Sequence, residues 1–219
     1  MCVNTRTLVC NKSMELLPKE PHCGLFVGVT GVGKTVFVLD LLENIYKDYF
    51  EYIVIFCSTL RNNKTYRERK FVWKDDDIFL VDLSPLDSPK KLNDYLKYFY
   101  EKLSGHECLF IIDDCSHQKD IVQKRNILAE LAFSGRHANI SVWVLTQKYN
   151  AVLKDFREQL KFVCLFYCKD RDSFEECLRE NDVIPSVAER KEVKKKLNQT
   201  IHSKLILKTS QPSSYRLLM

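Results

Sequence analysis

The chain has 219 residues, 45% of them hydrophobic and 29% charged, with a formal net charge of +5. This composition is typical of a globular protein in water, and the length suits a single α/β domain spanning residues 1–219, with little room for a second. Because the sequence has no run of about 18 apolar residues and no apolar block near its start, we expect neither a transmembrane helix nor a signal peptide, and no membrane partner.

The nine cysteines are scattered, and several lie inside apolar runs, where a thiol packs as a small hydrophobic group. An odd number without framework spacing indicates a reducing, intracellular compartment. Cys164 and Cys168 form the one pair that suggests a metal site. On a strand, however, residues i and i+4 lie too far apart for a zinc knuckle, so we expect no metal there.

Apolar runs rich in β-branched and aromatic residues alternate along the chain with helical patterns. The apolar runs predict strands at Cys23–Val29, Tyr52–Cys57, Ile78–Asp82, Cys108–Asp113, Ile140–Thr146 and Phe162–Cys168. The intervening patterns predict helices at Lys34–Asp48, Pro89–Leu103, Ile121–Phe133, Asn150–Gln159, Arg171–Glu180 and Ser186–Asn198. Near-continuous hydrophobicity is typical of strands that are covered on both faces. The alternation therefore predicts an α/β fold with a mostly parallel sheet and helices on both faces.

Both ends of the chain depart from this rhythm. Residues 1–20 alternate polar and apolar side chains and form a predicted N-terminal extension. Near the other end, Ser203–Lys208 and Tyr215–Met219 flank the sequence Gln-Pro-Ser-Ser. We therefore predict a closing β-hairpin within residues 200–219.

The first predicted strand runs into Gly28-Val-Thr-Gly31-Val-Gly33-Lys34-Thr35, which matches the phosphate-loop pattern G-x-x-x-x-G-K-[ST]. The glycines of this pattern let backbone N–H groups converge on phosphate oxygens, and the following helix adds the positive end of its dipole. We expect the loop to bind ATP through Gly28, Val29, Thr30, Gly31, Val32, Gly33, Lys34 and Thr35. Lys34 should bridge the β- and γ-phosphates, and the Thr35 hydroxyl should bind Mg²⁺.

Positive charge is concentrated in two segments. Ser58–Lys74 holds six basic residues against one acid, and Glu189–Lys208 holds seven against two. On a chain that is otherwise near neutrality, both segments are candidates for contact with a polyanion. Solvated surface faces explain the charge equally well.

Two acids, Asp113 and Asp114, follow the apolar run Leu109–Ile112. Ligands of open α/β sheets bind at the carboxyl ends of the strands, where these acids and the phosphate loop should meet. Asp113 is then expected to hold Mg²⁺, directly or through water, and Asp114 to polarise the attacking water as general base. The alternative is that the pair merely opens a turn, as aspartates often do.

Polar residues flank the next predicted strand, Ile140–Thr146. Gln147 follows the strand directly and should lie beside the acidic pair, near a γ-phosphate or the attacking water, if the two strands are neighbours. Arg136 precedes the strand, at the end away from its own subunit's nucleotide, where it could serve a neighbouring subunit as an arginine finger. A surface ion pair explains Arg136 equally well, and a structural role is favoured for His137. Arg157 is either a phosphate- or DNA-facing arginine or a helix-surface residue.

The series GVTGVGKT, LFIIDD, SGRHANISVWVLTQ and FREQLKFVCLFY resembles the poxvirus-type genome-packaging ATPases of the FtsK–HerA superfamily, found in large DNA viruses, virophages and Polinton-type elements. The resemblance runs from about residue 20 to the closing hairpin. It implies a RecA-like (ASCE) P-loop NTPase core and a homo-oligomeric ring, with a hexamer or pentamer expected. It also implies ATP-driven translocation of double-stranded DNA into a capsid, contacts with capsid proteins, and a location in the host cytoplasm, the nucleus or the assembling virion.

Carried over by position, the resemblance also assigns roles to individual residues, with ATP and Mg²⁺ as cofactors. It implies Lys34 and Thr35 for nucleotide and Mg²⁺, Asp113 for the metal, Asp114 as the catalytic acid, Gln147 as the γ-phosphate sensor and Arg136 as the trans finger. The superfamily often has glutamate where Asp114 stands. Because a shorter carboxylate must lie closer to the water, the role of Asp114 as base is less secure than that of Asp113.

Three alternatives share the phosphate loop with the packaging motor. One is a motor of the same superfamily that serves DNA segregation, conjugation or helicase-type processing. Another is a monomeric P-loop kinase acting on a metabolite, which would need no trans arginine. The third is a nucleotide-dependent switch that does no mechanical work. We recognise no separate processing or membrane module in the sequence, which favours the packaging motor.

Overall fold

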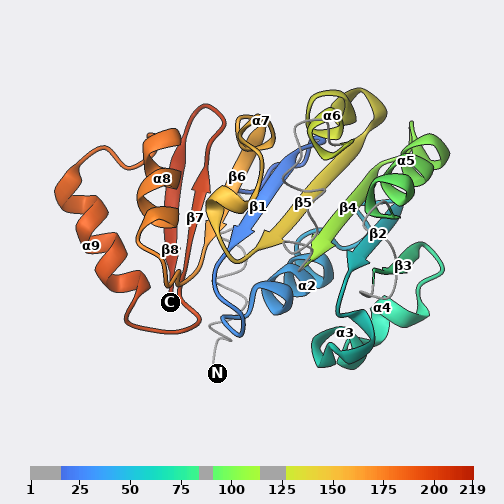
Figure 1. Cartoon of the computed structure of the whole chain (residues 1–219), viewed down its shortest axis with the longest axis horizontal. Coiled ribbons are helices and arrows are strands. Elements are labelled where there is room, and N and C mark those ends of the chain that lie inside the picture. The colour runs from blue at the N-terminus through green and yellow to red at the C-terminus, as the bar shows by residue number, and fades with distance from the viewer. Residues whose placement is uncertain (1–15, 84–90, 114–126) are drawn as a thin grey trace, which may run out of the picture.

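The computed structural model describes residues 16–83, 91–113 and 127–219, whose strands form one eight-stranded sheet (Figure 1). The strands are β1 (Cys23–Val27), β2 (Tyr52–Cys57), β3 (Ile78–Asp82), β4 (Cys108–Asp113), β5 (Ile140–Thr146), β6 (Leu160–Leu165), β7 (Lys204–Lys208) and β8 (Ser214–Leu218). Every strand that the sequence predicts is therefore present, including both strands of the closing hairpin.

Helices connect most of the strands. They are α2 (Lys34–Asn44), α3 (Lys64–Glu68), α4 (Lys70–Lys74), α5 (Lys91–Leu103), α6 (Ile127–Ser134), α7 (Lys154–Arg157), α8 (Asp172–Glu180) and α9 (Val187–Leu197). Among these described helices, none has the length and apolar character that crossing a bilayer requires.

The strand order across the sheet is β3-β2-β4-β5-β1-β6-β7-β8. Neighbouring strands from β3 to β6 are parallel, whereas β7 and β8 add antiparallel at the far edge. This order confirms the mostly parallel sheet and the C-terminal hairpin. It also places β4, β5 and β1 side by side in the middle of the sheet, so that the residues following these strands meet at one edge.

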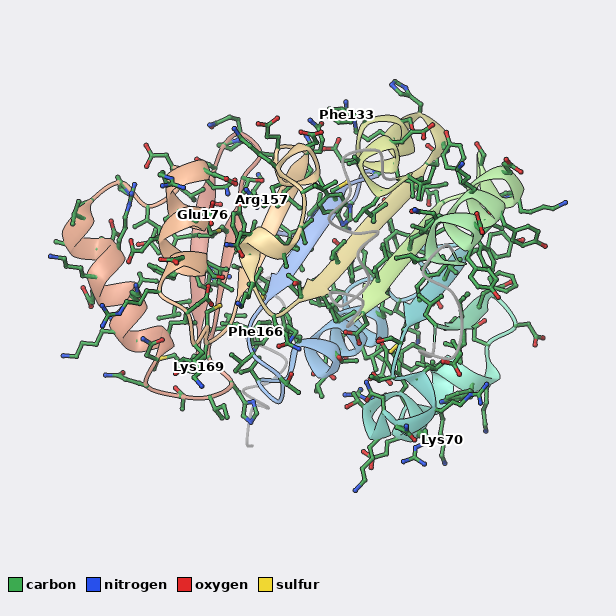
Figure 2. All side chains as sticks on the ribbon, viewed as in Figure 1. Lys70, Phe133, Arg157, Phe166, Lys169 and Glu176 are labelled. Atoms are coloured by element: carbon green, nitrogen blue, oxygen red, sulfur yellow. The ribbon has the colours of Figure 1, made fainter. Side chains whose placement is uncertain are left out.

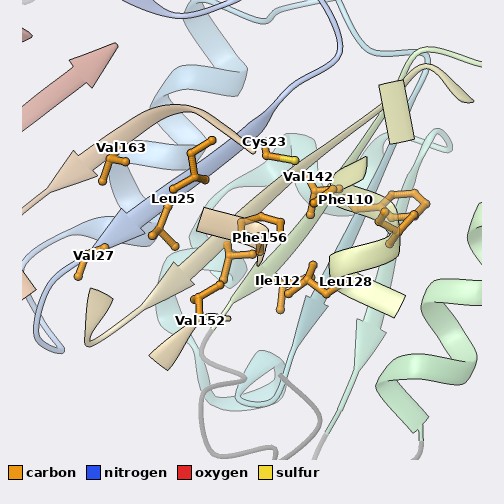
Figure 3. Packing of buried hydrophobic residues seen from close by; sticks show 14 of the residues in the cluster. Cys23, Leu25, Val27, Phe110, Ile112, Leu128, Val142, Val152, Phe156 and Val163 are labelled. Atoms are coloured by element: carbon orange, nitrogen blue, oxygen red, sulfur yellow. The ribbon is translucent and has the colours of Figure 1, made fainter. Parts of the chain in front are cut away.

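Two hydrophobic clusters cover the two faces of the sheet, because alternate residues of each strand point to opposite sides. On one face, buried side chains such as Leu25, Phe110 and Val142 pack against α5 to α9, and part of this packing is shown in Figure 3. On the other face, Phe26 and Trp143 pack against α2, α3 and α4 with their neighbours. The predicted arrangement of helices on both faces is confirmed.

The bounds of both hairpin strands differ from the predicted ones by one residue, and two of the predicted parallel strands also have different ends. β1 ends at Val27 rather than Val29, because the chain turns into the phosphate loop at Gly28. β6 lies at Leu160–Leu165 rather than Phe162–Cys168. Beyond Leu165 the chain leaves the sheet and contacts the phosphate loop. The backbone carbonyl of Tyr167 accepts a hydrogen bond from the N–H of Val29 at 3.1 Å.

The ends of several predicted helices also differ. The helix predicted to reach Asp48 ends at Asn44, and Asp48 itself adopts a left-handed φ of 57°, which a helix cannot continue. The helix predicted at Asn150–Gln159 is reduced to α7 after a 3₁₀ turn, since the N–H of Tyr149 donates to the Ser173 hydroxyl at 3.0 Å and fixes that segment by a tertiary contact. The start of the predicted helix Ile121–Phe133 lies outside the described residues.

The short helices α3 and α4 were not predicted. Asn63 caps α3, because its side-chain oxygen accepts a hydrogen bond from the N–H of Thr65 at 3.0 Å. Arg69 adopts an extended conformation and separates the two helices. Each helix buries one apolar side chain, Tyr66 or Val72, and five-residue helices are stabilised mainly by such packing rather than by their own propensity.

Candidate nucleotide-binding site

The phosphate loop joins β1 to α2 and adopts a backbone conformation that requires glycine. Gly31 has a φ of 86° and Gly33 a φ of 93°, both in the left-handed region that other residues rarely enter. Gly33 is also the residue before α2, and its carbonyl accepts from the N–H of Phe37 at 2.9 Å. The first N–H groups of α2 therefore point toward the loop, where they can donate hydrogen bonds to a bound anion.

Gly28 is required for a different reason, which is close packing. A Cβ atom at this position would lie 2.7 Å from the Cβ of Phe166 and 3.2 Å from the carbonyl oxygen of Tyr167. The N–H of Gly28 also donates to the carbonyl of Thr146 on β5 at 3.1 Å. The start of the loop is thus fixed between the ends of β5 and β6.

The Lys34 ammonium folds back over the loop. Its Nζ donates to the backbone carbonyl of Gly28 at 2.7 Å and to that of Val29 at 3.1 Å. These contacts keep a positive charge at the mouth of the loop, on the residue that the motif assigns to the β- and γ-phosphates.

Thr35 and Asp113 meet, as the sequence predicts. The Thr35 hydroxyl donates to Oδ2 of Asp113 at 2.8 Å, although the two residues are far apart in the sequence. Asp113 is only 3% exposed. A hydroxyl and a carboxylate are the hard oxygen ligands that Mg²⁺ prefers, so this donor set fits the metal that the phosphate loop implies.

Gln147 lies at the same edge of the sheet. It follows β5, which is the neighbour of β4 on one side and of β1 on the other. Leu145, two residues earlier, is the register partner of Asp113. Gln147 is therefore brought next to both the acid-bearing strand and the phosphate loop. Asp114, the predicted catalytic acid, lies outside the described residues.

Arg136 lies at the other end of β5, in the 3₁₀ turn Gly135–Ala138 that precedes the strand. β5 has seven residues, which is about 20 Å of extended chain, so Arg136 cannot reach the phosphate loop of its own subunit. The side chain is exposed and forms no ion pair with the part of the chain that the structure describes. The surface ion pair considered as an alternative is therefore not observed within that part. His137 beside it is also exposed.

Arg157 is buried and paired within the chain, so it is neither an exposed phosphate- or DNA-facing arginine nor a helix-surface residue. Its side chain is 8% exposed and lies 2.8 Å from Glu180 and 4.0 Å from Glu176 of α8 (Figure 2). It also donates to the Val152 carbonyl at 2.9 Å and lies over the ring of Tyr149. Both readings of Arg157 from the sequence were wrong, since no periodicity reveals that α8 supplies its partners.

Replacing Arg157 with alanine should lower the free energy of unfolding by about 3 kcal/mol, because the partly buried Glu180 carboxylate loses its ion-pair partner. Urea denaturation measures this change. Arg179→Ala is the matched control, because Arg179 pairs with the same Glu176 but its side chain is 76% exposed. That variant should change stability by less than about 1 kcal/mol. Unchanged stability in Arg157→Ala would contradict the structural role.

Cys164 is fully buried and Cys168 is partly buried, and the described residues hold no group of three or more His, Cys, Asp or Glu side chains beside them. Burial raises the pKa of the Cys168 thiol to about 12 and also raises that of Cys164 above its ordinary value. Metal-binding cysteines must be deprotonated, so buried thiols of this kind are poor ligands. Both side chains contribute to packing around the end of β6.

Comparison with known proteins places this chain in a family. The family described as Poxvirus A32 protein matches residues 12–213. The chain belongs to this family. The DNA packaging protein OPG160 of Variola virus is 28% identical over 196 residues, which cover 86% of this chain and 68% of the relative. The protein of the same name from Vaccinia virus (strain Copenhagen) is 27% identical over 191 residues, covering 85% of this chain and 66% of the relative. The match thus spans about two thirds of these relatives.

Solved structures similar to this A32-family chain share its fold. The genome packaging NTPase B204 from Sulfolobus turreted icosahedral virus 2, in complex with AMP, has a TM-score of 0.65 at 15% identity. The similarity covers 93% of this chain and 98% of B204. ATPases 2 and 3 of EssC from Geobacillus thermodenitrificans have a TM-score of 0.61 at 14% identity, covering 91% of this chain and 39% of that one. The fold of the A32-family chain is therefore that of the P-loop packaging NTPases.

Two residues of the candidate site were missed in the sequence. The hydroxyl of Tyr66, on α3, donates to Oδ2 of Asp113 at 2.8 Å. His202, in the turn before β7, lies with Nδ1 3.2 Å from the carbonyl of Val32 in the phosphate loop. Neither contact has a sequence signal, because each joins the site to a segment with no recognised motif.

Proposed function

We propose that this chain is an ATPase that moves double-stranded DNA into a viral capsid. The hydrogen bond between Thr35 and Asp113 carries the proposal, because it joins the phosphate loop and the acid-bearing strand into one site for nucleotide and Mg²⁺. Family membership supports the DNA substrate, since the Variola and Vaccinia relatives are named DNA packaging proteins. Such a protein would work inside the infected cell, in the cytoplasm, the nucleus or the assembling virion, and would contact capsid proteins.

The residues at the carboxyl ends of the parallel strands would have different roles in ATP hydrolysis. The loop N–H groups and Lys34 bind the phosphates, while Thr35 and Asp113 would hold Mg²⁺. When bound, Mg²⁺ would neutralise negative charge on the nucleotide phosphates. We assign to Gln147 contact with the γ-phosphate or the attacking water, and to Asp114 the role of general base.

A ring of identical subunits completes the site. Arg136 is exposed at the end of β5 opposite to Gln147, so in a head-to-tail ring it can enter the nucleotide site of a neighbour. There its guanidinium would stabilise the charge that develops on the transferred phosphoryl group. Six or five subunits are the expected ring sizes. Loss of the γ-phosphate would then loosen the contact between subunits, and repeated loosening would move the DNA.

Linear duplex DNA should raise the steady-state rate of ATP hydrolysis by the purified protein. The apparent DNA affinity should fall steeply with salt and should not depend on DNA sequence, because contacts to phosphates carry no sequence information. Phosphate release, measured against DNA concentration at several salt concentrations, tests both statements.

A duplex of equal length and different sequence is the control for sequence tolerance. An ATPase rate that ignores duplex DNA, together with phosphate transfer to a small metabolite, would contradict the proposal and favour the monomeric kinase. Hydrolysis without any response to DNA, in a protein that binds another partner only with ATP, would favour the switch.

A further inference from the structure

The basic segment Ser58–Lys74, which we call the basic arm, leaves the sheet beside the candidate site. It begins directly after β2, whose last residue, Cys57, is the register partner of Asp113 on β4. The arm then forms a 3₁₀ turn, α3 and α4 before the chain returns to β3 (Figure 1). The arm is therefore positioned by the same strand ends that position the metal-binding carboxylate.

The outer side of the arm carries cations that the protein does not neutralise. Lys64, Arg67, Lys70 and Lys74 are exposed, and none of them forms an ion pair within the described ranges of the chain. Lys70 projects outward from the body of the protein in Figure 2. Exposed cations close together attract a phosphate backbone, because binding releases the counterions condensed on the nucleic acid.

The second basic segment, Glu189–Lys208, carries most of its charge on α9 and differs from the arm. Its ion pairs are Arg190–Asp182, Lys194–Glu175 and Lys196–Glu192. On this helix only Lys191 and Lys195 lack an ion pair with other described residues. The arm therefore presents more free positive charge than α9, and it does so at the edge of the sheet that holds the candidate site.

The inner side of the arm is attached to the candidate site. Tyr66 is fully buried, and its hydroxyl donates to Oδ2 of Asp113 at 2.8 Å. The indole N–H of Trp73 donates to the carbonyl of Tyr66 at 2.8 Å and so ties α4 to α3. Arg69, between the two helices, lies 2.6 Å from Asp40 of α2, the helix that follows the phosphate loop.

We propose that the basic arm binds the phosphate backbone of duplex DNA and that Tyr66 is the positioning residue that links this binding to Asp113. The inference rests on the proposed DNA-dependent ATPase. One oxygen of Asp113 accepts from Thr35 on the loop side and from Tyr66 on the arm side. A hydrogen bond weakens steeply when its distance and angle change, so a small movement of the arm alters the orientation of the carboxylate.

Trp73 provides a direct readout of DNA binding at the arm. The protein has two tryptophans, of which Trp73 is 51% exposed and Trp143 is fully buried. Iodide should therefore quench Trp73 selectively. Saturating duplex DNA should reduce this quenching, and the effect should appear without ATP, so it does not depend on the activity of the loaded enzyme.

Charge reversal separates the arm from α9. Lys70→Glu with Lys74→Glu should abolish the protection of Trp73 and weaken DNA binding by at least about tenfold, whereas Lys191→Glu with Lys195→Glu changes the net charge equally and should leave the protection intact. Fluorescence anisotropy of a labelled duplex measures the affinity. If the α9 variant loses DNA binding and the arm variant keeps it, the assignment of the arm is overturned.

The link is tested by removing one hydroxyl. Tyr66→Phe should reduce the ratio of DNA-stimulated to unstimulated ATPase rates by about tenfold, the effect expected for one hydrogen bond to a charged group. Its Trp73 should still be protected by DNA. Tyr46→Phe is the matched control, because the Tyr46 hydroxyl is also buried but donates to the Pro18 carbonyl at 2.7 Å, away from Asp113. That control should keep the wild-type ratio.

The outcomes distinguish the link from the proposed function. If DNA stimulates the ATPase but does not protect Trp73, the arm is not the contact and the inference fails while the packaging function stands. If Tyr66→Phe keeps both the wild-type ratio and the Mg²⁺ concentration that gives half-maximal rate, the link through Tyr66 fails. If duplex DNA neither binds nor stimulates, the proposed function fails and the inference fails with it.

Discussion

Replacing Lys34 with alanine should lower the ATPase rate at saturating ATP by roughly 10²–10³-fold, the loss expected when one preorganised donor to the transferred group is removed. The ammonium already lies at the mouth of the phosphate loop, hydrogen-bonded to the Gly28 and Val29 carbonyls. Because backbone hydrogen bonds from Gly28 to Thr146 and from Val29 to Tyr167 also hold the loop, the variant should fold normally. Phosphate release at a series of ATP concentrations measures the rate.

Lys47→Ala is the control for this experiment, because Lys47 is an exposed lysine just beyond α2 with no place in the site. It should keep the wild-type rate. Direct titration with a fluorescent ATP analogue distinguishes loss of binding from loss of chemistry. A Lys34→Ala protein that hydrolyses ATP at the wild-type rate would mean that the phosphate loop is not the catalytic site.

Replacing Arg136 with alanine should reduce ATP hydrolysis by about 10³-fold or more if the guanidinium acts as an arginine finger between subunits. The exposed position of Arg136, at the end of β5 opposite to Gln147, leaves its guanidinium available to a neighbouring subunit. The same variant should leave nucleotide binding by its own subunit nearly unchanged. Binding and hydrolysis should therefore separate, which they would not do if Arg136 served its own phosphate loop.

Rings that contain both variant and wild-type subunits test whether Arg136 acts between subunits. When equal amounts of Arg136→Ala and wild-type subunits are mixed, only about 2% of hexamers contain wild-type subunits alone. A ring whose subunits act in turn should therefore lose far more than half of its DNA-stimulated activity. The neighbouring substitution His137→Ala should not have this effect. Activity that falls in simple proportion to the variant fraction would favour a monomeric enzyme and contradict the ring.

The sheet could be predicted from the sequence because its strands are nearly continuous apolar runs. A strand buried on both faces, such as β4, has no reason to alternate, and its hydrophobic residues alone set its position. The meeting of Thr35 with Asp113 could also be predicted, since parallel strands place their carboxyl ends at one edge. Both predictions follow from properties that are local in the sequence.

The features that were missed depend on contacts between distant segments. α3 and α4 have five residues each. They lie in a segment whose high charge is typical of a solvated loop. Tyr66 reaches Asp113 across 47 positions of the sequence, and the ion pair of Arg157 with Glu180 spans 23. No periodicity within a short window contains this information. Sequence patterns therefore predicted the loop and the acid-bearing strand, but not the residue that links the arm to them.

The position of β5 in the middle of the sheet has a mechanical consequence. The strand is buried along its whole length and is hydrogen-bonded to β4 on one side and to β1 on the other. β5 is therefore rigid along its length. Gln147 follows its last residue, and Arg136 lies in the turn before its first residue. If loss of the γ-phosphate displaces the end of β5 near Gln147, the end near Arg136 must move with it. In the proposed ring, the rigidity of the sheet would let a change at one nucleotide site reach the neighbouring subunit.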